Sequence, residues 1–264
     1  MSIFEAIILG LVQGLTEFIP ISSSGHLVIA QTIFSGASDH LFLEWINIGT
    51  LAALLVYFRL RIIGIVKDIF QNKNYSLARN IIITAVPAGA VGFVLSDFIA
   101  KTAFFGSIIT VTFTLAIVGV AMVVLEKLPK ASHVTSGEKL SPWRALIIGV
   151  AQILALIPGI SRSGSTIITG RLMGLNAAEA AEYSFLASLP IMLGVTLKLV
   201  ASSSDRHYFV DNASILILSN AVAFVSGLIA VGFLMSYLKK HGLTIFGWYR
   251  IGLAAILAIT LLVQ

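Results

Sequence analysis

Long runs of apolar residues, separated by short polar stretches, extend along the whole chain. A helix needs about 20 residues to cross a bilayer, and six runs reach or approach that length: residues 41–58, 80–98, 103–125, 180–200, 213–238 and 246–263. The third of these runs contains no charged residue, which makes it the clearest span. The pattern predicts an all-α polytopic membrane protein with six transmembrane helices.

Two further apolar regions, residues 3–36 and 143–175, are interrupted in the middle. Pro20 breaks the first region and Pro158 with Gly159 breaks the second, and a serine-rich turn follows each break. Each half is too short to cross a bilayer, so we predict a re-entrant helix-loop-helix pair in each region. Irregular backbone at membrane depth is tolerated only where protein or a wet cavity surrounds it, so both turns should lie inside the protein.

The two interrupted regions are copies of each other, because Gly10 returns as Gly149 and other identities follow at the same offset of 139 positions. The residues that recur in this way are Gly10, Gln13, Leu15, Ile21, Ser22, Ser24 and Gly25. The copies differ where they carry chemistry, since the first contains Glu17 and His26 and the second contains Arg162. This difference predicts a composite polar site. The alternative is a duplication that serves packing alone, but packing does not require buried charge.

Composition supports a membrane protein and excludes several kinds of chemistry. The chain of 264 residues is 58% hydrophobic and 11% charged, whereas soluble domains carry roughly a quarter charged residues. It contains no cysteine, which excludes disulfides, thiol catalysis and thiolate metal sites. Residues 1–5 include no basic side chain, so a cleaved signal peptide is not expected.

The distribution of Lys and Arg predicts how the helices are oriented. The loops at 59–79 and 126–144 and the turn near residue 240 carry 11 of these residues, and the opposite face carries Lys101, Lys198 and Arg206. Basic loops stay on the cytoplasmic side, so the first interrupted region should enter the membrane from outside and the second from the cytoplasm. We therefore predict one membrane domain, 1–264, with inverted halves at about 1–125 and 143–264, whose turns meet near the midplane.

Three ionisable residues in these apolar regions are candidates for chemistry: Glu17, His26 and Arg162. A charge within the membrane is costly and points to function. Gln13 lies four residues before Glu17 on the same helical face, and the pair could bind a hard divalent cation such as Mg²⁺ beside phosphate oxygens. The alternative for Glu17 is an ion pair with Arg162 that only holds the halves together, and for His26 it is a purely structural histidine.

The segment 158–166 has the composition of an anion-binding turn. Gly159 and Gly164 allow backbone N–H groups to turn inward, and a helix starting near residues 163–166 would direct its dipole at an anion. Arg162 offers a planar fork suited to phosphate, and four hydroxyls supply further donors: Ser161, Ser163, Ser165 and Thr166. The alternative is a serine-capped helix start beside an arginine that extends to the membrane surface.

At these motifs the chain resembles the bacterial undecaprenyl-diphosphate phosphatase family, also known as the bacitracin-resistance family, over essentially its whole length. The family motif of Glu or Gln, three intervening residues and Glu is met by Gln13 and Glu17, and it continues through the serine run to His26. The motif Pro-Gly-x-Ser-Arg-Ser-x-x-Thr is met by residues 158–166, and the segment 182–190 also fits. Many members have glutamate where this chain has Gln13.

The resemblance implies hydrolysis of undecaprenyl (polyprenyl) diphosphate to the monophosphate and inorganic phosphate in the bacterial plasma (inner) membrane. This reaction recycles the lipid carrier of cell-wall synthesis and confers bacitracin resistance. The resemblance also implies a divalent cation, Mg²⁺ or Ca²⁺. The expected partners are the polyprenyl diphosphate and membrane lipids and no nucleic acid; a homodimer is allowed but not required.

Each candidate residue is assigned a role in this reaction. Phosphate would be bound by Arg162 with the hydroxyls of Ser22, Ser161, Ser163 and Thr166, and the cation by Glu17 with Gln13, where Gln13 acts as a neutral ligand or a hydrogen-bonding partner. His26 would be the general base or the nucleophile, and Ser23 is the alternative nucleophile with His26 as its base. Two other classes of function remain: a secondary transporter, since inverted repeats with broken helices are a transporter design, and a lipid flippase without chemistry.

Overall fold

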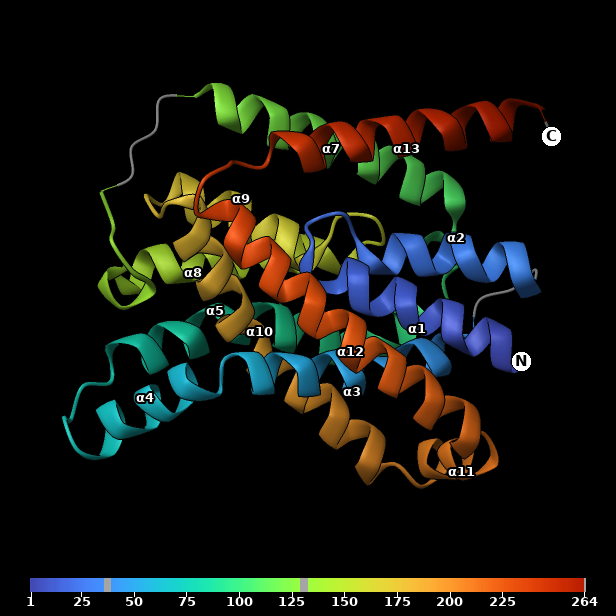
Figure 1. Ribbon diagram of the computed structural model, residues 1–264, viewed down its shortest axis with the longest axis horizontal. Helices are drawn as coiled ribbons and strands as arrows, with labels where there is room; N and C mark the ends of the chain where they lie inside the picture. Colours follow the sequence, from blue (N-terminus) through green and yellow to red (C-terminus); the bar gives the residue numbers. More distant parts are fainter. Residues whose placement is uncertain (36–38, 129–132, 264) are drawn as a thin grey trace.

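The computed structural model describes residues 1–35, 39–128 and 133–263, and within these ranges it is built from helices (Figure 1). Five of the described helices are long and apolar enough to cross a membrane: α5 (Ser76–Val94), α7 (Ile108–Lys127), α10 (Ala177–Ala201), α12 (Ala213–Leu238) and α13 (Thr244–Val263). α3 (His40–Tyr57) and α4 (Arg59–Phe70), which meet at a bend of 69°, pass the same test only together and make a sixth span when the pair is counted as one. The predicted all-α, multi-pass membrane fold is confirmed.

Two of the predicted spans have different ends in the structure. α5 starts at Ser76 rather than at residue 80, and the backbone N–H of Ser76 donates to the side chain of Asn74 there. The polar Asn80 and Thr84 of α5 are buried and donate to carbonyl groups of the neighbouring segment before and within α8 (Pro142–Ile153). α5 also ends at Val94 and is followed by the short helix α6 (Ser96–Lys101). The span predicted from residue 103 begins at Ile108, because residues 103–106 form a separate 3₁₀ turn, η1 (Ala103–Gly106).

Each interrupted region forms a hairpin of two short helices. In the first, α1 (Ile3–Phe18) runs into the molecule and α2 (Ser23–Ser35) runs back to the same side; in the second, α8 and α9 (Arg162–Leu172) do the same from the opposite side (Figure 1). A further 3₁₀ turn, η3 (Leu154–Leu156), follows α8. The hairpin arrangement agrees with the prediction for both regions.

The two hairpins pack on long helices through equivalent glycines. α1 lies against α12, where a Cβ added at Gly10 would come within 2.6 Å of the carbonyl oxygen of Ser219. α8 lies against α5, where a Cβ added at Gly149 would come within 2.7 Å of the carbonyl oxygen of Thr84. Gly10 and Gly149 are equivalent in the repeat, so the duplicated sequence produces the same close helix contact twice.

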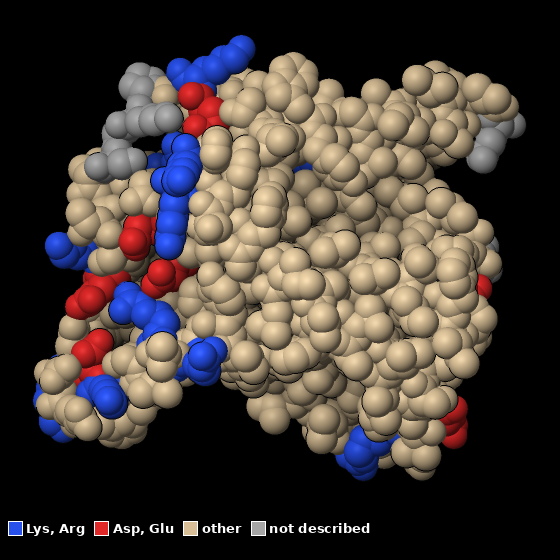
Figure 2. All heavy atoms as spheres, in the orientation of Figure 1, with Lys and Arg blue, Asp and Glu red and all other residues tan. Residues whose placement is uncertain are grey.

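Charged side chains gather at one end of the molecule. Figure 2 shows blue and red residues concentrated on the left, over α4 and the chain segments near it, while most of the remaining surface is uncharged. The basic loops that the sequence analysis assigned to the cytoplasm lie at this end (Figures 1 and 2), except that Lys130 is outside the described residues. Two short helices with few apolar residues, η2 (Gly137–Lys139) and α11 (Ser203–Asp211), complete the described fold.

Candidate functional site

The turns of the two hairpins meet inside the protein, as the sequence predicted. The guanidinium of Arg250, from α13, donates to the carbonyl oxygen of Pro20 in the first turn at 2.9 Å and to those of Gly159 and Ile160 in the second. Arg250 is completely buried. One side chain therefore joins both turns and satisfies three carbonyl groups that their irregular backbone leaves outside the helices.

Both turns place a serine in the same conformation just before a helix. Ser22 and Ser161 have φ angles of 77° and 75°, in the left-handed region that non-glycine residues rarely adopt. The Ser22 hydroxyl accepts a hydrogen bond from the backbone N–H of Gly25, and the Ser161 hydroxyl accepts one from Gly164. These hydroxyls therefore cap α2 and α9, so the structure gives the predicted phosphate-binding Ser22 and Ser161 a capping role.

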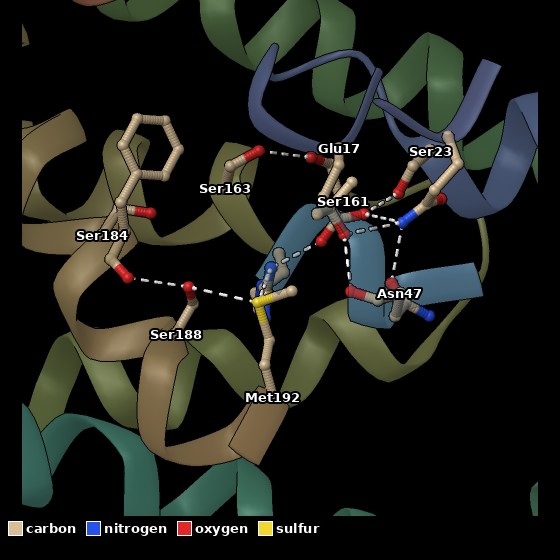
Figure 3. Close-up of polar contacts among 12 residues, drawn as sticks. Glu17, Ser23, Asn47, Ser161, Ser163, Ser184, Ser188 and Met192 are labelled. Atoms are coloured by element: carbon tan, nitrogen blue, oxygen red, sulfur yellow. Dashed lines mark hydrogen bonds and ion pairs between the residues drawn. The ribbon is translucent and has the colours of Figure 1, made fainter. Parts of the chain in front are cut away.

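An ion pair connects the two turns directly. Nη2 of Arg162, the first residue of α9, lies 2.5 Å from Oε1 of Glu17 in α1, and both side chains are largely shielded from solvent. The Ser23 hydroxyl donates to the other Glu17 oxygen, Oε2, at 2.5 Å. Figure 3 shows Ser23 and Asn47 beside Glu17. The structure thus brings together the predicted Glu17, Arg162 and Ser23.

Gln13 reaches the same carboxylate from one helical turn away. Its amide nitrogen Nε2 lies 3.2 Å from Oε2 of Glu17, 2.8 Å from Oδ1 of Asn47 and 3.3 Å from Oγ1 of Thr50. Gln13 therefore donates hydrogen bonds to its neighbours in this arrangement. Of the two roles that the sequence left open, hydrogen-bonding partner and neutral cation ligand, the geometry favours the first.

The remaining predicted hydroxyls line the second turn and are bonded within the protein. Ser163 is buried with its Oγ 3.1 Å from that of Ser161. Thr166 donates to the carbonyl oxygen of Arg162 and lies 2.5 Å from the hydroxyl of Ser184 in α10. These contacts fix the backbone at the start of α9, whose first-turn N–H groups and dipole face the meeting point of the turns.

His26 lies in α2 but turns towards α13. Its Nδ1 is 2.7 Å from the carbonyl oxygen of Ser22, and its Nε2 is 2.8 Å from the hydroxyl of Tyr249, whose ring stacks on the imidazole. A carbonyl can only accept, so Nδ1 carries a proton and donates to Ser22, and Nε2 is hydrogen-bonded to the Tyr249 hydroxyl. Both ring nitrogens are therefore engaged away from Glu17 and Ser23, and the structure does not place His26 beside the Ser23 hydroxyl as a base.

Three residues at the site were missed in the sequence. Asn47 accepts a hydrogen bond from Gln13. Arg250 donates to the carbonyl oxygens of both turns, and Tyr249 bonds to His26. Arg250 alone carried a readable signal, because it is the only charged residue in the apolar run 246–263 and a charge there calls for a function.

The donor set at Glu17 fits a cation that arrives with a phosphate and does not fit one held by protein alone. Among the described residues there is no group of three or more His, Cys, Asp or Glu side chains that could hold a metal ion. Mg²⁺ commonly uses one or two protein carboxylates and completes its shell with phosphate oxygens and water. Glu17, with the adjacent Ser23 hydroxyl, meets that smaller requirement.

An apolar cavity of about 750 Å³ lies beside the polar site. It is formed between α3, α5 and α10, and Asn47, the partner of Gln13, is one of its few polar lining residues. Leu156 and Pro190 line it as well. A cavity of this size and polarity suits an apolar chain, and Asn47 connects it with the Gln13–Glu17 group.

Comparisons with known proteins identify the family of the chain. The family model described as "Bacitracin resistance protein BacA" matches residues 6–256. The chain is 34% identical over 262 residues to "Undecaprenyl-diphosphatase 2" of Paramagnetospirillum magneticum, covering 98% of this chain and 99% of the relative. It is 36% identical to the protein named "Undecaprenyl-diphosphatase" in Parvibaculum lavamentivorans, with 97% and 95% covered, and also 36% identical to that in Enterococcus faecalis, with 97% and 96% covered.

Proposed function

The chain belongs to the bacitracin resistance protein BacA family and is a membrane-bound undecaprenyl-diphosphate phosphatase, and we propose that it acts where Glu17 and Arg162 meet. The observation that carries this proposal is the ion pair between the two turns, with the Ser23 hydroxyl bonded to the same carboxylate. Arg162 supplies the positive charge that binds phosphate, Ser23 supplies the nucleophilic hydroxyl, and Glu17, which contacts both, supplies the base. That is the arrangement that covalent phosphoryl transfer requires.

Binding of the diphosphate changes the partners of Arg162. Its guanidinium suits phosphate oxygens in a bidentate manner, so it turns from Glu17 to the terminal phosphate, assisted by the first-turn N–H groups of α9. This movement frees Oε1 of Glu17, while Oε2 keeps its hydrogen bond from the Ser23 hydroxyl. The substrate thereby exposes the carboxylate that accepts the Ser23 proton.

In the first chemical step the Ser23 oxygen attacks the terminal phosphorus. A bond from Oγ to phosphorus forms as the bond to the bridging oxygen breaks, the serine proton passes to Glu17, and the polyprenyl monophosphate leaves. In the second step water attacks the phosphoserine, the proton on Glu17 returns to the serine oxygen, and inorganic phosphate is released. Arg162 stabilises the charge that develops on the transferred phosphoryl group in both steps.

A divalent cation, Mg²⁺ or Ca²⁺, is also proposed to bind with the diphosphate. Glu17, once released by Arg162, would be its protein ligand, and Ser23 is close enough to contribute its hydroxyl. When bound, such an ion neutralises charge on the leaving phosphate. Gln13 keeps the Glu17 carboxylate in place by donating to it.

The polyprenyl tail is proposed to enter the apolar cavity between α3, α5 and α10. Asn47 lines the cavity and accepts from Gln13, which bonds to Glu17, so a lipid with its chain in the cavity would present its diphosphate to the turns. The cavity takes only the first part of so long a chain, and the remainder extends into the bilayer.

Release of phosphate from purified protein tests the function. Protein in detergent, given undecaprenyl diphosphate, should release inorganic phosphate with turnover. A transporter or a lipid flippase would release none, and this result would reject the hydrolytic site.

The nature of the trapped intermediate tests the role of Ser23. Rapid quenching should yield a phosphoenzyme that survives acid and disappears in Ser23→Ala. An adduct that is acid-labile and base-stable would instead identify His26 as the nucleophile, and absence of any adduct in all variants would indicate direct attack by water. Either result would remove the serine step while leaving the phosphatase function intact.

We also propose that the halves at about 1–125 and 143–264 form an inverted repeat within one domain. The matched glycine contacts, the matched φ angles and the opposite entry sides of the hairpins support it. The chain has no cysteine, so single cysteines report sidedness without background. Lys73→Cys should react only from the cytoplasmic side and Arg206→Cys only from outside; reaction of both from one side would contradict the proposal.

A further inference from the structure

α4 has 12 residues, too few to cross a bilayer by itself, and it bends away from α3. It follows α3 at an angle of 69°, so if α3 runs across the bilayer, α4 lies close to the membrane plane. None of its residues is buried. It therefore depends on something outside the described fold to cover it.

Every exposed residue of α4 lies on one face of the helix. The exposed positions follow the spacing i, i+1, i+4, i+7, i+8 and i+11, which is a single helical stripe, and they are Arg59, Leu60, Ile63, Val66, Lys67 and Phe70. Leu60 and Phe70 are 73% and 72% exposed. Four apolar and two basic side chains share this face, and no acidic one does.

The opposite face of α4 is directed towards the body of the protein. Ile62 and Ile65 pack against the main core. Arg61 forms an ion pair with Glu182 of α10 at 2.9 Å, and Asp68 accepts a hydrogen bond from Asn72. The helix is thus fixed in its rotation, so the stripe of Leu60, Ile63, Val66 and Phe70 faces outward permanently.

The exposed face of α4 lies at the end of the molecule where basic and acidic residues both gather (Figure 2), but the face itself carries only basic charge. Arg59 and Lys67 lie on the stripe, and Lys73 is exposed in the turn that follows it. A helix with an exposed apolar stripe and flanking Lys and Arg is suited to the interface of an anionic membrane, where the apolar side chains enter the acyl boundary and the basic ones meet the headgroups. A protein partner would not require cations on an apolar stripe.

We propose that the exposed face of α4, with Lys73, binds anionic phospholipid on the cytoplasmic leaflet. The face holds the helix in the membrane plane and attracts negatively charged headgroups to the cytoplasmic end of the protein. This property does not depend on the phosphatase site, because the face lies on the far side of α4 from the residues that pack on the core.

Fluorescence quenching tests whether the face is in the membrane. A cysteine at Ile63, labelled with an environment-sensitive dye and reconstituted in vesicles, should be quenched by brominated acyl chains as strongly as one at Ile259 on the exposed surface of α13. A cysteine at Gln71, in the turn after the helix, should be quenched weakly. Equal quenching at Ile63 and Gln71 would overturn the proposal and indicate a face that is open to water or to a soluble partner.

Titration with anionic lipid tests the headgroup preference. In phosphatidylcholine nanodiscs with increasing phosphatidylglycerol, Lys67→Gln with Lys73→Gln should weaken enrichment of the anionic lipid around the protein by about fivefold per charge removed. The matched control is Lys239→Gln with Lys240→Gln, which removes the same charge from the same end but not from α4. An equal loss in both double variants, or no loss in either, would contradict a site on α4.

Discussion

The turn at Ser22 and the turn at Ser161 can be compared residue by residue. Their φ angles differ by two degrees, and each serine caps the next helix through an N–H three residues on, at 3.2 Å and 3.1 Å. In each turn the same hydroxyl also lies near that of a serine two residues on, Ser24 or Ser163. The two turns therefore share the same backbone conformation at the serine and the same helix cap, although Gly159 has a positive φ of 87° where the first turn has Pro20.

The two copies differ at the positions that carry charge. Arg162 stands where the first turn has Ser23, and Leu156 stands where the first hairpin has Glu17. Were the halves identical, two carboxylates or two guanidiniums would face each other across the meeting point and repel. The difference between the halves puts opposite charges in contact instead, and a diphosphate can separate them. On the proposed account, the repeat supplies the scaffold and the few residues that differ between its copies form the site.

The largest effect should follow loss of the first turn's carboxylate. Glu17→Gln removes the proposed base and the charge that binds the cation, so turnover should fall by up to about 10⁴-fold, the upper range for a general base. The control is Ser165→Ala in the second turn, whose hydroxyl only contacts the Arg162 carbonyl; it should retain most activity. Phosphate release measures both. Comparable losses in the two variants would remove the special role of Glu17.

Loss of the Arg162 guanidinium in the second turn should have the next largest effect. Arg162→Lys keeps the charge but loses the planar pair of donors, so the rate should fall by about 10²–10³-fold, as for removal of a transition-state donor. Purified protein should remain folded, as judged by its thermal unfolding. Near-normal turnover in this variant would reject the assignment of Arg162 to the transferred phosphate.

A smaller effect is expected from loss of the hydrogen bond between Tyr249 and His26, which follows the first turn. Tyr249→Phe removes the hydrogen bond to Nε2 of His26 but keeps the stacked ring, so the rate should fall by a factor of about 2–10, the value of one hydrogen bond. Trp248→Phe on the neighbouring, exposed position is the control. A loss as severe as that of Glu17→Gln would mean that His26 takes part directly in the chemistry.

The smallest effect on rate should come from substitution of Gln13 and Gln152, which are equivalent in the two hairpins. The two substitutions should nevertheless have different consequences. Gln13→Glu adds a carboxylate beside Glu17 and should shift the cation titration to lower concentration while activity with cation is retained. Gln152→Glu buries a carboxylate next to the Thr84 carbonyl oxygen, with no cation site to accept it, so it should lower the unfolding temperature without changing the titration. Identical behaviour of the two variants would show that the first hairpin has no special affinity for a cation.

The sequence predicted the spans and the two turns because both depend on local properties. Hydropathy runs identify helices that cross the membrane, and Pro20 and Pro158 mark the breaks. The contact of Glu17 with Arg162 was also predictable, since an inverted repeat brings its equivalent turns together. Such arguments need no knowledge of which side chains touch.

Contacts between distant helices could not be predicted in the same way. Asn47 lies 34 residues from Gln13, and nothing in its apolar surroundings says that it faces the site rather than the membrane boundary. The direction of His26 was equally hidden, because its partner Tyr249 comes from the far end of the chain. The capping of α2 and α9 by Ser22 and Ser161 was hidden as well, because a serine at a helix start looks the same in sequence whether it caps the helix or binds phosphate; their contact with phosphate stays a prediction.

A double-mutant cycle between the turns tests the central claim that neither half is a site without the other. Glu17→Gln, Arg162→Lys and the combined variant are compared in kcat/KM and in thermal unfolding. If the two residues act as one unit, the combined variant should be no slower than the slower single variant, because residues that act together are strongly non-additive. Effects that multiply, or losses confined to unfolding temperature with turnover preserved, would show that the pair only holds the halves together.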